Sequence, residues 1–391
     1  MRRSIPMSAA SRQPPAEHRR TTRIWPSLLA SVLPVALFLA VVAVWQSGPQ
    51  RPGLALDLSF LAYPANFDLS ESLIRYSGAD SYARALLAGL LNTLLVSACA
   101  IALASGLGLL LAAARLSSNP LLSRLAAAVV EAVRNVPLLL QLFAWYALLT
   151  TSLPALRSAW SPLPGVLLSN RGLWLPRLDA AGAGWWAATA ALLAALLAIA
   201  WLRYAARKAR HARRGWRLVP VAAALLAALA VLLWRGQWPQ WELPTLQGFR
   251  VTGGVSLSPE LCALLAGLSV YTSGSLAEVF RAAIRAVPTG QTEAAKAIGL
   301  GVLARWRKVV LPQAARIAMA PTTSQYVNIV KNSSLAVAIG FPDVMSVSNT
   351  IINQSGQAVT MVLLLMVSYC AIGLLIAWLM HGLEARHGQP D

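Results

Sequence analysis

Long apolar runs, separated by short polar or basic segments, dominate this sequence. A helix needs about 20 apolar residues to cross the hydrocarbon core of a bilayer. Eight runs reach or approach that length: 24–45, 85–114, 121–149, 185–202, 218–233, 259–277, 317–335 and 359–379. The third begins in an amphipathic piece, 121–133, and continues as 138–149. The pattern predicts an all-α fold, a polytopic transmembrane helical bundle of about eight spans.

Basic residues lie beside alternate ends of these runs. Cytoplasmic loops of membrane proteins carry an excess of lysine and arginine. If the chain starts inside and crosses eight times, its arginine-rich segments share one side: 1–23, 115–124, 203–217 and 278–316. The segments on the other side are poorer in basic residues: 46–84, 151–183 and 235–258. We therefore expect both termini in the cytoplasm, and the first run as a retained anchor rather than a signal peptide.

Composition supports a membrane protein and argues against other classes. Hydrophobic residues make up 57% of the chain and charged residues only 12%, about half the usual share of a soluble domain. The net charge of +19 would suggest nucleic acid in a soluble protein, but here the basic residues flank apolar runs. Cys99, Cys262 and Cys370 lie inside apolar runs without metal-ligand spacing, so we expect no metal site and no disulfide.

One polar segment between two spans carries a specific motif. Glu293, Ala294 and Ala295 are followed by Gly299, a gap of nine residues, and then Val309-Val310-Leu311-Pro312. The first part can form a short helix that Gly299 ends in a left-handed conformation. Residues 302–310 then restart a helix, and Pro312 marks the return towards the next span. The plain alternative is an ordinary amphipathic loop.

This spacing resembles the EAA loop of the membrane subunits of ABC importers, with Val309 where isoleucine is common. The flanking sequences at 134–141, 273–290, 311–317 and 331–335 are similar to the permeases for polar amino acids of the HisM/GlnP type. The whole chain looks like the longer permease of the general L-amino-acid importers. The resemblance is dense at 81–150 and 259–380 and less diagnostic elsewhere.

The resemblance implies a type I ABC importer (MetI-like) core of five spans in a bacterial inner membrane. The implied organisation begins with a cytoplasmic tail (1–23) and an extra N-terminal span with a periplasmic segment (24–80). The core follows in two parts, 81–150 and 259–380, the second of which carries the EAA loop. An insertion with two extra spans (151–258) separates the two parts, and a C-terminal tail (381–391) follows them.

The resemblance also implies partners: a dimeric cytoplasmic ATPase, a second related permease, a periplasmic amino-acid-binding protein and L-amino-acid substrates. The residues implied in coupling to the ATPase are Glu293, Ala294, Ala295, Gly299, Leu311 and Pro312. The chain has no G-x-x-x-x-G-K-[ST] loop, so ATP and Mg are expected on the partner ATPase. This chain itself is expected to be a non-catalytic subunit without a cofactor.

Polar residues at membrane depth are costly and usually functional, so they are candidates for a substrate pathway. They are Gln325, Asn328, Lys331, Asn332, Ser333 and Ser334, with Asn92, Thr93 and Gln141 as further options. Lys331 would attract a substrate carboxylate or, alternatively, snorkel to the interface. The other polar groups would contact substrate or bond across helices. Glu131 with Arg134, and Glu278 with Arg281, are expected to form structural ion pairs.

Two other functional classes compete with the importer subunit. An ion-coupled secondary transporter acting alone usually carries acidic residues inside the membrane and internal repeats. Here Glu131 and Asp343 are expected near span ends, and no repeat is evident. A non-transporting membrane scaffold would leave the spacing of the EAA motif unexplained. The substrate range, a homodimeric or heterodimeric permease pair, and the role of the basic 203–217 loop stay open.

Overall fold

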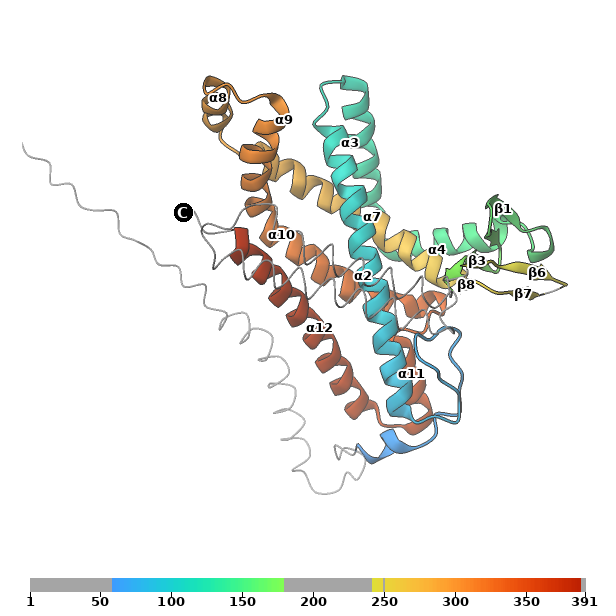
Figure 1. Ribbon diagram of the computed structural model, residues 1–391. Coiled ribbons are helices and arrows are strands. Elements are labelled where there is room, and N and C mark those ends of the chain that lie inside the picture. Colours follow the sequence, from blue (N-terminus) through green and yellow to red (C-terminus); the bar gives the residue numbers. More distant parts are fainter. Residues whose placement is uncertain (1–57, 179–240, 249, 388–391) are drawn as a thin grey trace, which may run out of the picture.

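The computed structural model describes residues 58–178, 241–248 and 250–387 (Figure 1). The spans expected at 24–45, 185–202 and 218–233 lie outside the described residues, as do the tail 1–23 and the basic loop 203–217. Within the described part, the fold is a bundle of helices with a small β-unit. The principal helices are α2 (Tyr82–Arg115), α3 (Pro120–Asn135), α4 (Leu138–Ala147), α7 (Pro259–Arg285), α10 (Leu311–Asn332) and α12 (Ala358–His387).

Three of these helices, α2, α7 and α12, are each long and apolar enough to cross a membrane. Two bent pairs pass the same test together: α3 with α4 and its extension to Ser152, bent by 101°, and Val302–Ile339 with Val344–Ser355, bent by 53°. The described residues therefore contain three candidate spans, or up to five if each bent pair is one span. The expected total of eight is not established by them.

The bend between α3 and α4 has a local cause. Val136 is extended and precedes Pro137, a position that disfavours helical conformation. The side-chain amide of Gln141 donates to the carbonyls of Val133 (2.8 Å) and Val136 (3.0 Å), which the break leaves without helical partners. The expected third run is therefore two helices at a sharp angle, and Gln141 stabilises the corner between them.

In the described part of the chain, the runs expected at 85–114, 259–277 and 359–379 lie within the longer helices α2, α7 and α12, and one element was missed. The seventh run begins earlier, at Leu311, and continues through the 3-10 helix η6 (Ser333–Ile339). Between it and α12 lies α11 (Val344–Ser355), which the apolar pattern did not predict. Asp343 begins α11 by accepting a hydrogen bond from the Ser346 N–H (2.8 Å), and it is completely buried.

The expected external loop contains strands, so the all-α prediction is wrong for this region. The antiparallel sheet has the order β1-β2-β3-β8, and there are two further strand pairs, β4-β5 and β6-β7 (Figure 1). The strands are β1 (Trp160–Leu163), β2 (Val166–Ser169), β3 (Gly172–Leu175), β4 (Arg177–Leu178), β5 (Trp241–Glu242), β6 (Thr245–Gln247), β7 (Arg250–Thr252) and β8 (Val255–Leu257). Strands from both ends of the insertion therefore pair with each other.

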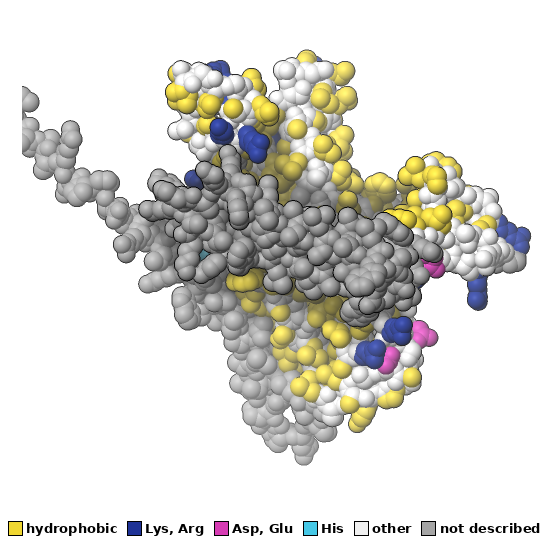
Figure 2. All heavy atoms as spheres, viewed as in Figure 1, with side chains coloured by type: hydrophobic (Ala, Val, Ile, Leu, Met, Phe, Trp, Pro, Cys, Tyr) yellow, Lys and Arg dark blue, Asp and Glu magenta, His cyan; other side chains and the backbone are white. Residues whose placement is uncertain are grey.

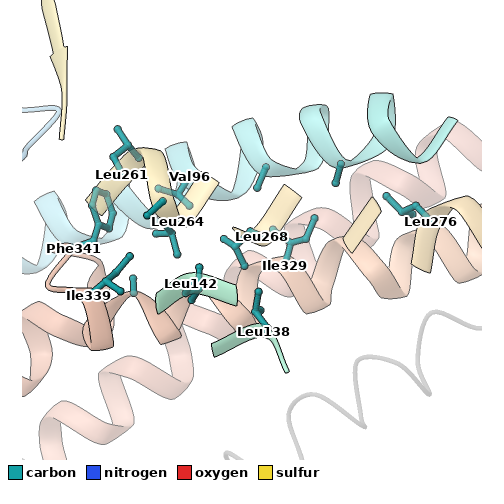
Figure 3. Packing of buried hydrophobic residues seen from close by; sticks show 14 residues of the cluster. Val96, Leu138, Leu142, Leu261, Leu264, Leu268, Leu276, Ile329, Ile339 and Phe341 are labelled. Carbon is teal, nitrogen blue, oxygen red and sulfur yellow. The ribbon is translucent and has the colours of Figure 1, made fainter. Parts of the chain in front are cut away.

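The core lies around α7, which packs against α2, α4 and α10. Figure 3 shows its buried side chains, among them Val96 of α2, Leu142 of α4, Leu268 of α7 and Ile329 of α10. Small residues allow the close approach of helices in a membrane. A Cβ on Gly108 of α2 would lie 2.8 Å from the Cβ of Leu276 on α7.

Candidate functional site

The loop that carries the EAA motif forms a compact helical turn at one end of the bundle. It contains α8 (Thr289–Ala297), α9 (Val302–Arg305) and the π-helical turn η5 (Trp306–Val310). In Figure 1 this loop lies at the end of the molecule opposite to α11. Only three residues separate α7 from α8, and η5 runs directly into α10. The loop is therefore joined stiffly to two central helices.

Gly299 ends α8 in the predicted left-handed conformation, with φ of +78°. Its N–H donates to the carbonyl of Lys296 (2.9 Å), and the Leu300 N–H donates to the carbonyl of Ala295 (3.0 Å). This pair of bonds is the Schellman arrangement, which satisfies carbonyls that the helix end leaves free. No atom lies within 4 Å of a Cβ built on Gly299, so glycine is required there by backbone conformation alone.

The loop exposes apolar side chains. Ile298 is 76% exposed, Val302 64% and Leu303 81%, whereas Ala295 is buried. Figure 2 shows hydrophobic side chains with Lys and Arg among them over α8 and α9. We call Ile298, Val302 and Leu303 the loop patch. Exposed apolar side chains gathered in this way are typical of a surface that binds another protein.

A cluster of small side chains supports the loop from below. Ala283 and Val287 of the α7 end pack with Val310 of η5 and with Ala314 and Ala318 of α10. Leu311 and Pro312, which the sequence placed at the re-entry, are exposed at the start of α10. The end of α7 and the start of α10 are therefore packed directly against each other beside the loop.

Ion pairs join α7 and α2 near this end. Glu278 pairs with Arg115, the last residue of α2, and with Arg281 (2.7 Å). The expected Glu278–Arg281 pair is confirmed. Glu131 and Arg134 form no ion pair with each other; instead the Arg134 stem packs close to Gly274 of α7.

The candidate substrate residues are partly brought together. Gln325, Asn328, Lys331 and Asn332 lie on α10, and Ser333 and Ser334 begin η6. The two serine hydroxyls donate to carbonyls three residues earlier, Val330 (2.8 Å) and Lys331 (2.7 Å), and both serines also form side-chain hydrogen bonds with Tyr369 of α12. A cavity of about 260 Å³ lies between α2, α7, α10 and α12, but none of these six residues lines it.

Asn92 and Thr93, offered as further pathway residues, bond to backbone. The Asn92 amide donates to the carbonyls of Glu71 and Pro342 (both 2.9 Å). The Thr93 hydroxyl accepts a hydrogen bond from the Val344 N–H (3.0 Å). Both side chains are buried, so they stabilise the fold at the α11 end. The sequence does not indicate these contacts of Asn92 and Thr93, because their partners lie in distant parts of the chain.

The segment before α2 adds a further tie at that end. The Glu71 carboxylate accepts a hydrogen bond from the Ser258 N–H (2.6 Å), and Ser258 caps α7. Burial raises the pKa of Glu71 above its usual value, and the hydrogen bond from Ser258 opposes that shift. The sequence offered no signal for this contact because Glu71 lies in a mixed segment far from α7.

Comparison with known proteins identifies the family. Residues 216–388 match the family described as "Binding-protein-dependent transport system inner membrane component". YhdX of Escherichia coli is 42% identical over 92% of this chain and 93% of its own length. The general L-amino acid transport system permease protein AapQ of Rhizobium johnstonii is 40% identical over 86% of this chain and 84% of its own. A solved structure titled "Crystal structure of an amino acid ABC transporter with histidines" aligns with a TM-score of 0.46 at 18% identity, covering 78% of this chain and 95% of that one. The chain therefore belongs to the family of inner-membrane permease components of binding-protein-dependent transport systems, together with permeases of amino-acid ABC transporters.

Proposed function

We propose that the loop from α8 to η5 is the surface through which a separate ATPase drives this permease subunit of an amino-acid ABC importer. The observation that carries the proposal is the loop patch, three exposed apolar side chains on a turn joined to α7 by three residues. Ile298, Val302 and Leu303 would enter an apolar groove of the ATPase. Movement of that groove would then displace α7 and α10 as rigid bodies.

The proposed orientation places this loop in the cytoplasm, with both chain termini on the same side. The β-unit and α11 would then lie outside, where a substrate-binding protein delivers its cargo. The complete importer would contain two ATPase copies, a second related permease and that binding protein around a MetI-like type I core. ATP and Mg belong to the ATPase in this arrangement, because this sequence has no P-loop.

We propose that the substrates are L-amino acids of several kinds. This proposal is supported by the relative AapQ, which is named as a permease of a general L-amino acid transport system. The proposed pathway follows Gln325, Asn328 and Lys331 along α10 to Asn332, Ser333 and Ser334. Asn328 and Lys331 are exposed in this single chain, and Lys331 supplies a cation for a substrate carboxylate. An ion-coupled transporter acting alone has no support from the family.

The coupling role is tested at two glycines of the same loop. Gly299→Val forces a β-branched residue into a left-handed conformation, at a cost of roughly 1–2 kcal/mol. Gly301→Val is the matched control, since φ there is −61° and no atom lies within 4 Å of the new Cβ. We expect Gly299→Val to lose both ATPase co-purification and amino-acid uptake, and Gly301→Val to retain them.

Direct tests of the loop patch complete the experiment. Replacing Leu303 with Ser should weaken ATPase binding without unfolding the permease, because that side chain is 81% exposed. Normal assembly and uptake in both Gly299→Val and Leu303→Ser would refute the coupling assignment.

A further inference from the structure

The segment 341–355, which contains α11, is bounded by two glycines in the left-handed conformation. Gly340 has φ of +81° and Gly356 has φ of +69°, and no atom lies within 4 Å of a Cβ built on either. The segment is also bent by 53° from the helix before it. We call residues 341–355 the strap. Both glycines form sharp turns with open space around them, so the position of the strap depends on the contacts of the residues between them.

On one side the strap is attached to α2 through backbone groups. A Cβ on Gly89 would lie 3.1 Å from the Asp343 carbonyl oxygen, so the two backbones are in close contact. The Asn92 amide donates to the Pro342 carbonyl, and the Val344 N–H donates to the Thr93 hydroxyl. Thr93 is completely buried, which gives this bond more weight than one exposed to water.

On the other side the strap is attached to α12. The Tyr369 hydroxyl donates to one carboxylate oxygen of Asp343 (3.3 Å), while the other oxygen accepts from the Ser346 N–H (2.8 Å). Asp343 is completely buried. A buried carboxylate is costly unless donors surround it. Tyr369 and the first turn of α11 therefore stabilise the strap in this position, together with Val347 and Ile351, which are buried in a cluster with Tyr82 of α2.

The attachment to α2 leads back to the loop at the far end. α2 carries Thr93 near the strap and ends at Arg115, which pairs with Glu278 of α7. α2 and α7 are in close contact at Gly108 and Leu276, and α7 continues into α8 after three residues. The strap and the loop patch thus lie at opposite ends of one rigid pair of helices (Figure 1).

We propose that Thr93 and Tyr369 are positioning residues that hold the strap closed in the resting permease, and that their hydrogen bonds must break before the path opens at the α11 end. This inference rests on the proposed function, in which the α11 end faces the binding protein. Docking of the loaded binding protein would release the strap, and α2 with α7 would pass the change to the ATPase. In this proposal the released strap belongs to the state that activates the ATPase, so loosening the strap shifts the population towards that state and raises ATPase activity without the binding protein.

The test uses the whole importer, with permease, ATPase and binding protein reconstituted in lipid. Thr93→Val removes the hydroxyl and keeps the shape, whereas Thr93→Ser keeps the hydroxyl. Tyr369→Phe removes the hydroxyl that donates to Asp343 and that also bonds to Ser333 and Ser334. Thr323→Val is the matched control, because the Thr323 hydroxyl bonds only within its own helix, to the Met319 carbonyl (2.9 Å). ATPase activity is measured with and without binding protein, together with thermal stability.

We expect Thr93→Val and Tyr369→Phe each to raise the activity without binding protein by about fivefold, the shift that one net hydrogen bond produces in a two-state equilibrium. Thr93→Ser and Thr323→Val should stay at the wild-type level. If Thr93→Val and Tyr369→Phe lower thermal stability without raising this activity, the bonds are merely structural and the proposal fails. The coupling role of the loop is tested separately, by loss of ATPase co-purification in Gly299→Val. Failure of the strap proposal can therefore be distinguished from failure of the proposed coupling role.

Discussion

Glu278 of α7 forms an ion pair with Arg115, the residue at which α2 ends, and also binds Arg281 one helical turn away. The Arg115 side chain is only 15% exposed, so its charge relies on Glu278 rather than on water. This pair joins the two helices that connect the loop with the strap. Its loss should therefore affect both stability and coupling.

Replacing Glu278 with Gln should lower the free energy of unfolding by on the order of 2 kcal/mol, because it leaves a partly buried arginine without its counter-charge. Thermal unfolding of the purified permease measures the effect. The control is Glu242→Gln, which breaks the pair with Arg177 (2.9 Å) between two well-exposed side chains. That change should cost less than about 1 kcal/mol. Equal losses in the two variants would contradict the assigned role of Glu278.

Two glycines of α2 should respond differently to the same substitution. Gly108→Val would place a Cβ 2.8 Å from the Leu276 Cβ and separate α2 from α7, at a cost of about 1–3 kcal/mol. Gly106→Val meets no atom within 4 Å at its Cβ. We expect reduced thermal stability and uptake for Gly108→Val only. If Gly106→Val is equally harmful, the close packing of these helices is not the cause.

The corner between α3 and α4 should depend on the Gln141 amide. Gln141→Leu removes the donors to the Val133 and Val136 carbonyls and leaves polar atoms unpaired, at a cost of about 1–3 kcal/mol. Gln141→Asn, with a shorter side chain, should recover little of this loss. Thermal unfolding and proteolysis near Pro137 measure the change. Unaltered stability in Gln141→Leu would show that the corner is held by Pro137 alone.

Stability should vary with pH through Glu71. Because burial raises its pKa, the folded protein holds the Glu71 proton more tightly than the unfolded chain does. The resulting stabilisation is fully present below the usual pKa of 4.5 and is lost as pH rises through the raised value. Glu71→Gln keeps an acceptor for Ser258 but cannot ionise. The melting temperature of this variant relative to wild type should therefore increase from pH 4 to pH 7, and a constant difference would contradict the prediction.

Several features could be predicted from the sequence because they depend on local chemistry. The runs around α2, α7 and α12 were visible since a bilayer requires a long apolar stretch wherever the chain crosses it. The turn at Gly299 was visible since only glycine readily adopts a left-handed conformation at the end of a helix. The pair Glu278–Arg281 was visible since residues three apart share one helix face.

Other features depend on residues that are distant in the chain. β3 pairs with β8 although about eighty residues separate the two strands in the sequence, and each strand is too short to give a period-2 signal. The α11 helix is too short for a span, so its place was not evident from hydropathy. The sequence by itself determined where α2, α7 and α12 form as long apolar helices and where α8 ends, because apolar length and backbone conformation are local properties. Only the tertiary structure decided that Asn92, Thr93 and Asp343 hold the α11 end together, because a buried polar group takes its role from the partner that folding places beside it.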